Sequence, residues 1–196
     1  MALYFQRQNG ERVIRAFAKK VADLPGGATI STSELTQSIL KEGTPIGAKD
    51  SNGVYHVVKT AVMAKVATSS ATTYTVAKGH NFKAGDYVTL GTGKKAYAIS
   101  SIATNGTDAT LDDITVGTTL GAAAAVGDVL IQASAEASGN TSTFKYKPVG
   151  LLGESYNVDN LGSLFANVVL IGVVKEENID AVGDSVKGVL TGIQFV

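Results

Sequence analysis

The sequence has no cysteine, no tryptophan, only three prolines and few charged residues. The lack of cysteine excludes disulfide bonds, thiolate metal sites and cysteine nucleophiles. Charged residues make up 17% of the chain, below the roughly 25% of an average globular protein. Lysine plus arginine and aspartate plus glutamate number 17 each, so the basic excess typical of nucleic-acid binding is missing. We expect no nucleic-acid partner. The zero net charge instead favours association with other proteins.

Long apolar runs are missing as well. No segment approaches the 18 or more uninterrupted apolar residues of a membrane-spanning helix. The first twelve residues contain no continuous apolar stretch of the kind found in a secretory signal. We therefore expect no membrane partner, and a protein that is made in the cytoplasm and stays there until it assembles.

The residues that are present suffice for a core. The chain has 196 residues, of which 44% are hydrophobic and 7% aromatic. This composition supports one substantial core or two small ones. The densest apolar segment, residues 165–174, is rich in β-branched side chains and predicts a buried strand. A surface turn is expected at 176–180 and a last strand over 186–196.

One α-helix is predicted, over residues 10–24. Val13, Phe17, Val21 and Leu24 fall on one stripe of such a helix. A polar residue before the segment and Pro-Gly-Gly after it suit the two helix ends. A single amphipathic helix of this length needs a docking surface, either on its own domain or on another subunit.

The remaining pattern predicts short strands. Asn-Gly at 52–53 is the strongest hairpin signal in the chain and predicts strands near 45–48 and 54–58. Residues 61–143 are dominated by alanine, threonine, glycine and serine, with short strands between turns, which predicts a small β-barrel or sandwich. The strands expected there are 63–67, 73–76, 87–90, 95–100, 110–111 and 129–133.

A Gly-Asp pair preceded by an apolar residue occurs three times, within residues 84–88, 126–130 and 182–186. The uneven separation of the three copies argues against a solenoid repeat. We interpret the pattern as a glycine turn that begins a strand.

Patterns that carry catalysis or bind cofactors are missing from the sequence. His56 and His80 are its two histidines, and neither has a neighbour at metal-ligand spacing. No Gly-x-Ser-x-Gly elbow supplies a hydrolase nucleophile. We expect structural roles for both histidines, no catalytic residue, no metal site, no cofactor and no enzyme activity. An enzyme would need a site assembled from His56, His80 and distant carboxylates.

Two segments partly match ligand-binding motifs. Gly91 to Ala96 satisfies Gly-x-Gly-x-x-Ala after a strand, but the residues that follow are strand-like, whereas a dinucleotide site needs a helix there. We expect a hairpin. Asp108, Asp112 and Asp113 could offer oxygen ligands to calcium, but the spacing of a helical calcium loop is missing. We expect a solvated turn.

The outer parts of the chain carry a family pattern. It consists of Gly43-Thr44-Pro45-Ile46-Gly47, the turn at 52–53, and then residues 149–152, 156–159 and 166–174. This pattern resembles the lambda-type phage head decoration proteins, and it is similar to that of phage head fibre proteins. Pro45 departs from the family, which usually has a plain apolar residue at that position.

The resemblance implies a mainly β protein. Residues 31–60 and 144–196 would form a discontinuous β-tulip-like decoration domain, and residues 61–143 an inserted small β-barrel or sandwich domain. Residues 1–30 would supply an N-terminal arm and the amphipathic helix.

The resemblance also implies a virion structural protein, made in the host cytoplasm and placed on the capsid exterior. It would bind the major capsid protein of an icosahedral phage as a homotrimer and stabilise the shell. Leu3, Tyr4 and Phe5 occupy the position of the capsid-contacting arm. The inserted domain would project outward, where it could touch host surface glycans. The alternative is another phage structural or glycan-binding adhesin module, such as a tail or surface component.

Overall fold

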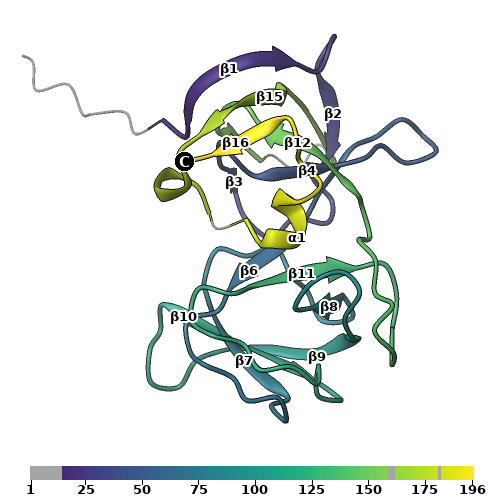
Figure 1. The fold of residues 1–196 in the computed structure, drawn as a ribbon, viewed down its shortest axis with the longest axis vertical. Coiled ribbons are helices and arrows are strands. Elements are labelled where there is room, and N and C mark those ends of the chain that lie inside the picture. The colour runs from purple at the N-terminus through teal and green to yellow at the C-terminus, as the bar shows by residue number, and fades with distance from the viewer. Residues whose placement is uncertain (1–14, 159–161, 181) are drawn as a thin grey trace, which may run out of the picture.

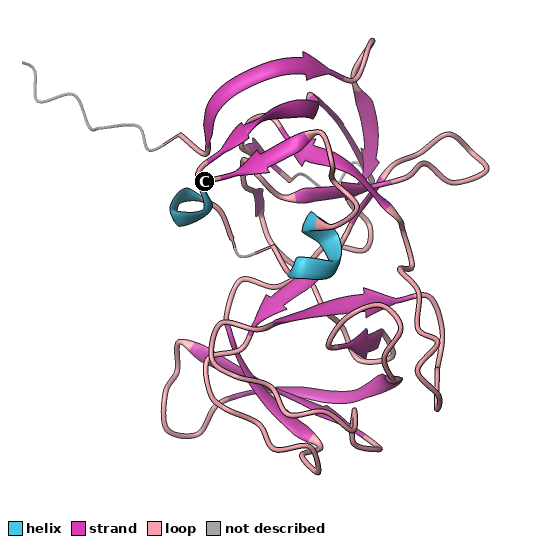
Figure 2. Cartoon of the chain, viewed as in Figure 1, coloured by secondary structure: helices cyan, strands magenta, loops and turns pink. Residues whose placement is uncertain are grey.

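The computed structural model describes residues 15–158, 162–180 and 182–196. It is mainly β, as expected (Figure 2). Its strands form two six-stranded sheets and two two-stranded ones. Helical structure in these residues is limited to the 3-10 turn η1 (Glu176–Asn178) and α1 (Asp184–Lys187). None of the described helices has the length and apolar character needed to cross a membrane.

The first six-stranded sheet, which we call the upper sheet, combines both outer parts of the chain (Figure 1). Leu151 of one outer block pairs with Pro45 of the other and with Val169. The two apolar blocks therefore lie in one sheet. Its strands run β1 (Phe17–Asp23), β15 (Val168–Val174), β12 (Pro148–Leu152), β4 (Pro45–Gly47) and β5 (His56–Val57), with β16 (Ile193–Phe195) parallel to β15.

The predicted hairpin is confirmed, with shorter strands. β4 and β5 are antiparallel, and Ile46 lies opposite Val57. The Asp50 carboxylate accepts hydrogen bonds from the backbone N–H groups of Asn52 and Val54, and Gly53 adopts a φ of 81° that favours glycine. Two further pairs belong to the outer parts of the chain: β2 (Ala28–Ser31) with β14 (Ser163–Ala166), and β3 (Ile39–Leu40) with β13 (Tyr156–Asn157).

The second six-stranded sheet, the lower sheet, comes from one continuous stretch of chain. Five of its strands overlap predicted ones, whereas β6 ends just before the strand expected at 63–67, where only isolated bridges form at Met63 and Ala67. The order is β6 (Thr60–Val62), β11 (Val129–Ala133), β8 (Tyr87–Thr89), β9 (Ala96–Thr104), β10 (Leu111–Val116) and β7 (Thr73–Ala77).

Of the small β-barrel or sandwich expected for residues 61–143, the barrel is not formed. None of the sheets in the described residues closes on itself. In the lower sheet, the two edges approach each other at one isolated antiparallel bridge, between Met63 and Val76. Continuous ladders on both sides of every strand would be needed for closure, so the sheet is curved but open.

The helix predicted over residues 10–24 is wrong where the structure describes it. Residues 10–14 lie outside the described residues, and Phe17–Asp23 form strand β1, which pairs with β15 through three register shifts. Phe17 is buried, but Val21 is 60% exposed, so the helical stripe is not the buried face. Backbone pairing with a long, largely buried strand outweighs a helical pattern read from a few apolar residues.

The predicted C-terminal strand is partly wrong. Val186 is buried within α1, and the strand begins only at Ile193. The strand predicted over 165–174 is interrupted at Asn167, whose side-chain amide donates a hydrogen bond to Asp23. Phe165, before this break, is 68% exposed. The apolar run therefore contains an edge strand, β14, and a central strand, β15.

The first two Gly-Asp pairs form the same turn. Gly85 and Gly127 have φ values of 90° and 92°. In each turn the following aspartate, Asp86 or Asp128, donates its backbone N–H to the residue three positions earlier and accepts that residue's N–H with its carboxylate. The third copy differs, because Gly183 has a φ of −65° and precedes α1. The prediction of a strand-starting turn is confirmed for two copies and wrong for the third.

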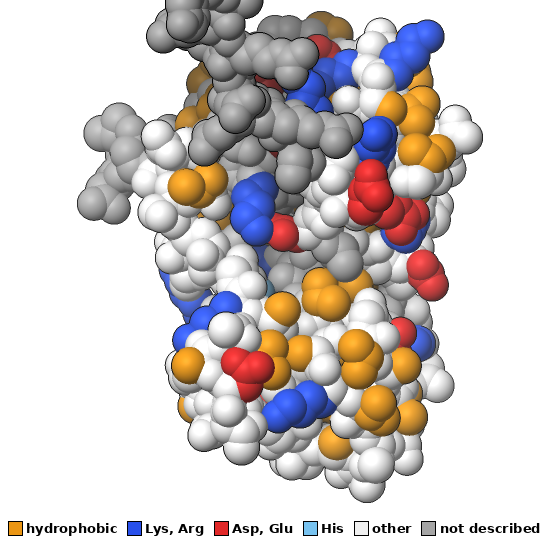
Figure 3. All heavy atoms as spheres, turned by 90° about the vertical axis from the view of Figure 1, so that its left-hand side faces the viewer, with side chains coloured by type: hydrophobic (Ala, Val, Ile, Leu, Met, Phe, Trp, Pro, Cys, Tyr) orange, Lys and Arg blue, Asp and Glu red, His pale blue; other side chains and the backbone are white. Residues whose placement is uncertain are grey.

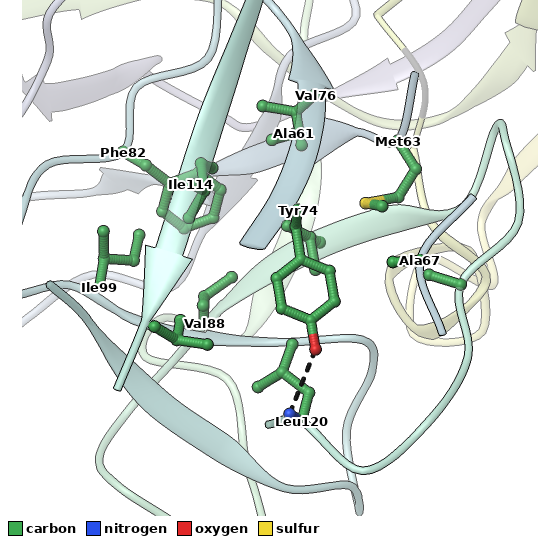
Figure 4. Close-up of a cluster of buried hydrophobic side chains, with 13 residues drawn as sticks. Ala61, Met63, Ala67, Tyr74, Val76, Phe82, Val88, Ile99, Ile114 and Leu120 are labelled. Atoms are coloured by element: carbon green, nitrogen blue, oxygen red, sulfur yellow. Dashed lines mark hydrogen bonds between the residues drawn. The ribbon is translucent and has the colours of Figure 1, made fainter. Parts of the chain in front are cut away.

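Each sheet has its own core, and one cluster joins them. In the lower core the Tyr74 hydroxyl donates to the Ala71 carbonyl and accepts the Leu120 N–H at 3.2 Å (Figure 4). In the connecting cluster Ile131 of β11 packs with Leu151 and Val169 of the upper sheet. The two sheets are thus held together by apolar contact.

Candidate functional site

The predicted capsid-contact residues Leu3, Tyr4 and Phe5 lie outside the described residues. The chain that follows them is firmly attached. Ala16 is 2% exposed, donates its N–H to Glu42, and accepts the N–H of Lys175 at 2.8 Å. The described chain therefore begins beside a fixed point, Ala16, at the start of β1.

Apolar side chains are exposed on strands β1 and β15 and after β16. Val21 on β1 is 60% exposed and Ile171 on β15 is 48% exposed, and Ile171 is paired with the neighbour of Val21, Ala22. Val196 follows β16, is 59% exposed, and donates its N–H to Val174. We call Val21, Ile171 and Val196 the entry surface. Exposed apolar side chains on neighbouring strands suit contact with another protein.

The lower part of the molecule presents a different surface. Figure 3 shows hydrophobic side chains in several small groups on the lower half of one face, with polar and charged atoms between them. Among the exposed apolar residues of this part are Val66 and Val126. Scattered apolar groups of this size are ordinary on soluble proteins, and they do not mark a particular partner.

His56 belongs to a cluster beside the hairpin. Its ring stacks on Tyr146, with centroids 3.9 Å apart, and its Nε2 lies 3.4 Å from the Asp50 carboxylate. The Tyr146 hydroxyl donates to Glu34, which also pairs with Lys145. Burial, and to a smaller extent the negative charge of Glu34, raise the pKa of Tyr146 to about 12. Tyr146 thus stays protonated and ties the hairpin to the segment before β12.

His80 has a separate set of partners. Its side chain is 6% exposed, and its Nε2 lies 3.4 Å from Asp112. Burial lowers the pKa of His80, and the Asp112 charge opposes this only in part. The two histidines are therefore attached to different carboxylates, Asp50 and Asp112.

The segment Gly91 to Ala96 is a hairpin, as expected. It connects the antiparallel strands β8 and β9, and no helix follows it. Its backbone N–H groups are already engaged: Thr92 donates to Ser185, and Gly93 and Lys94 donate to Ser142. A phosphate loop needs such N–H groups free to face the ligand, so this turn is built as a structural connection.

The three aspartates of the expected solvated turn have different environments. Asp108 accepts hydrogen bonds from Thr110, which lower its pKa. Asp112 and Asp113 lie on β10 instead of in the turn. Two hydrogen bonds lower the pKa of Asp113: the larger effect comes from the Thr75 hydroxyl and the smaller from the Asn105 amide. Within the described ranges no three histidine, aspartate or glutamate side chains gather in a way that could hold a metal ion.

Two cavities lie where the sheets meet. The first, of about 370 Å³, is bordered by the β8–β9 hairpin and by residues around α1, with Lys94, Asp128 and Lys187 at its rim. The second, of about 280 Å³, is lined by residues 57–62 of the connection between the sheets and by the turn 77–81. Neither was predicted, because each combines residues that are far apart in the sequence.

A buried ion pair was also missed. Lys59 is 2% exposed, and its Nζ lies 2.8 Å from Asp86, which also accepts a hydrogen bond from Gln132. The one available signal was a single lysine within the apolar run from Val54 to Val62. Its partner could not be identified, since Asp86 comes from a distant turn.

Comparison with protein-family models, with curated proteins and with solved structures gave no match.

Proposed function

We propose that the chain is a capsid decoration or head fibre protein, which binds the outer surface of an icosahedral phage capsid as a trimer. The observation that carries this proposal is the pairing of β4, β12 and β15, because it brings together the two blocks that resemble the decoration family. Residues 31–60 and 144–196 would form the β-tulip-like domain, with residues 61–143 as the inserted domain.

The entry surface supports the same proposal. Val196 is exposed and bonds to Val174, which lies opposite Phe17 at the start of β1, and Val21 and Ile171 are exposed further along β1 and β15. Exposed apolar side chains on these strands suit a protein contact in addition to that of the proposed arm. The partner in this arrangement is the major capsid protein, and the bound protein belongs to the exterior of the virion.

The mechanism is adhesion. A trimer presents three arms at once, so weak contacts reinforce one another through a high effective concentration. Binding to the expanded shell and not to its loosened state stabilises the shell by about 3–4 kcal/mol per site, when the free protein is present at several hundred times Kd. No bond is made or broken.

The test is co-sedimentation with shells assembled from the major capsid protein encoded in the same genome. We expect the full chain to be a trimer by light scattering and to pellet with the shells. A variant that lacks residues 1–14 keeps β1 and the entry surface, so we expect it to remain a folded trimer that no longer pellets.

The outcomes separate the parts of the proposal. A full chain that stays in the supernatant overturns the decoration function. Undiminished pelleting of the shortened chain overturns only the assignment of the arm. Binding to a glycan array without affinity for shells would identify a glycan-binding adhesin instead.

A further inference from the structure

Two turns, one from each sheet's part of the chain, are joined by a set of side-chain hydrogen bonds. The side-chain amide oxygen Oδ1 of Asn81 accepts hydrogen bonds from the backbone N–H groups of Thr36 at 3.0 Å and Gln37 at 3.3 Å. The His80 backbone carbonyl accepts the Thr36 hydroxyl at 3.0 Å and the Gln37 amide at 3.2 Å. We call these four residues, Thr36, Gln37, His80 and Asn81, the clasp.

The clasp spans the two halves of the molecule. Thr36 and Gln37 precede β3, which lies with the upper sheet, and His80 and Asn81 follow β7 of the lower sheet (Figure 1). His80 and Asn81 also line the cavity of about 280 Å³ between the halves. Opening the clasp would therefore widen that cavity.

The ring of His80 is fixed in its neutral form by its contacts. Its Nδ1 accepts the backbone N–H of Phe82 at 3.2 Å, so this nitrogen must carry a lone pair and the single ring proton is on Nε2. Nε2 is buried, lies 3.4 Å from Asp112, and makes no hydrogen bond there. The site thus accepts imidazole and disfavours imidazolium.

We propose that the clasp is an acid-sensitive connection between the two sheets, which protonation of His80 releases. A proton on Nδ1 would face the Phe82 N–H, placing two donors against each other. The hydrogen bond that closes the turn from His80 to Phe82 is then lost. This turn carries the His80 carbonyl and the Asn81 side chain, which hold Thr36 and Gln37.

Charged groups around the ring act in opposite directions. Asp112 on β10 attracts an imidazolium. Lys78, whose Nζ lies 3.7 Å from Asp112, weakens that attraction. Thr36 and Gln37 present only hydroxyl and amide groups to the turn, and Lys83 donates to the Ser33 carbonyl next to the clasp. Asp113 is engaged with Thr75 and Asn105.

The sign of the pH effect follows from burial. The pKa of His80 in the closed clasp lies below the ordinary 6.5, so the open state binds the proton more tightly. The clasp is therefore fully stabilised above pH 6.5 and loses stability as the pH falls below that value.

The experiment is NMR on the full chain, which has only two histidines. Ring titrations are followed together with hydrogen-exchange protection factors of the Thr36 and Gln37 amides between pH 7.5 and 5. We expect His80 to titrate below 6.5 and both protection factors to fall about tenfold, while the amide of Ile114 in the lower sheet stays protected.

The matched variant is His80→Asn. An asparagine carbonyl can accept the N–H two residues ahead, in place of Nδ1, but does not titrate. We expect its clasp protection to be independent of pH. Equal pH dependence in both proteins overturns the proposal. Should the variant not fold, the wild-type titration decides: loss of protection that does not follow the His80 midpoint overturns the proposal, and coincidence supports it.

Discussion

At the scale of single residues, the pair of Lys59 and Asp86 places a charged side chain in the interior. The lysine is 2% exposed, whereas the Asp86 side chain is 14% exposed and keeps hydrogen bonds from Gln132 and from the Lys83 N–H. The two partners are therefore unequal. An unpaired lysine would remain in the interior, but an unpaired aspartate would still be hydrogen-bonded and close to water.

This inequality predicts unequal mutational costs. We expect Asp86→Asn to lower the free energy of unfolding by roughly 3–5 kcal/mol, since it leaves a buried charge without its partner. Lys59→Met, which replaces the lysine by an apolar side chain of similar length, should cost about 1 kcal/mol. Chemical denaturation of both variants measures the difference.

The double variant is the control for this prediction. Adding Lys59→Met to Asp86→Asn removes the unpaired charge, so the double variant should be more stable than Asp86→Asn alone. Additive losses would show that the charge of Lys59 is not the cause.

At the scale of elements, regular strands were predictable and their exceptions were not. Five strands of the lower sheet overlap predicted segments, β10 at Leu111 alone, and β6 does not. The segment of β1 was predicted as a helix, because its strand conformation depends on pairing with β15, about 150 residues away in the sequence. At the interruption, the Asn167 side-chain amide donates to Asp23 and its backbone N–H donates to the Tyr156 hydroxyl. Neither partner is a neighbour of Asn167 in the sequence, so no local pattern predicts these bonds.

Glycine at 150 is required by close packing between β12 and β15. A Cβ at this position would lie 2.5 Å from the Val169 carbonyl oxygen and 2.8 Å from the Val168 side chain. We expect Gly150→Ala to lower the free energy of unfolding by roughly 1–3 kcal/mol, measured by thermal or chemical denaturation. Gly117→Ala, where nothing lies within 4 Å, is the matched control. A similar loss in both variants would contradict the packing argument.

At the scale of the whole molecule, the upper sheet is assembled from segments separated by the entire lower sheet. The local sequence pattern predicted most strands of the lower sheet. The family resemblance predicted that the two outer blocks belong together. The clasp, the two cavities and the Lys59 pair were beyond prediction, because each is formed by side chains that only tertiary structure brings together. The capsid-contact role of Leu3, Tyr4 and Phe5, which lie outside the described residues, stays a prediction.

The role of β1 in this assembly predicts a sharp difference between two truncations. Removal of residues 1–14 leaves β1 intact and should change the melting temperature little. Removal of residues 1–24 deletes β1, exposes the edge of β15, and takes Ala16 and Phe17 out of the core. We expect the longer truncation to unfold cooperatively at a much lower temperature, or to be insoluble, in scanning calorimetry. Equal melting temperatures would show that β1 is not part of the stable fold.

The pairing of β15 with β1 and β16 also indicates where another protein or peptide could be fused to the chain. Phe17 and Phe195 both lie opposite Val174, so the start of β1 and the C-terminus lie on the same side of the upper sheet, at the left in Figure 1. A protein fused after Val196 would lie on this side of the upper sheet, next to the surface that we propose contacts the shell. The tip of the β9–β10 loop at Gly106, where an added side chain meets nothing within 4 Å, belongs to the other sheet. Insertion there would carry a displayed peptide away from that contact.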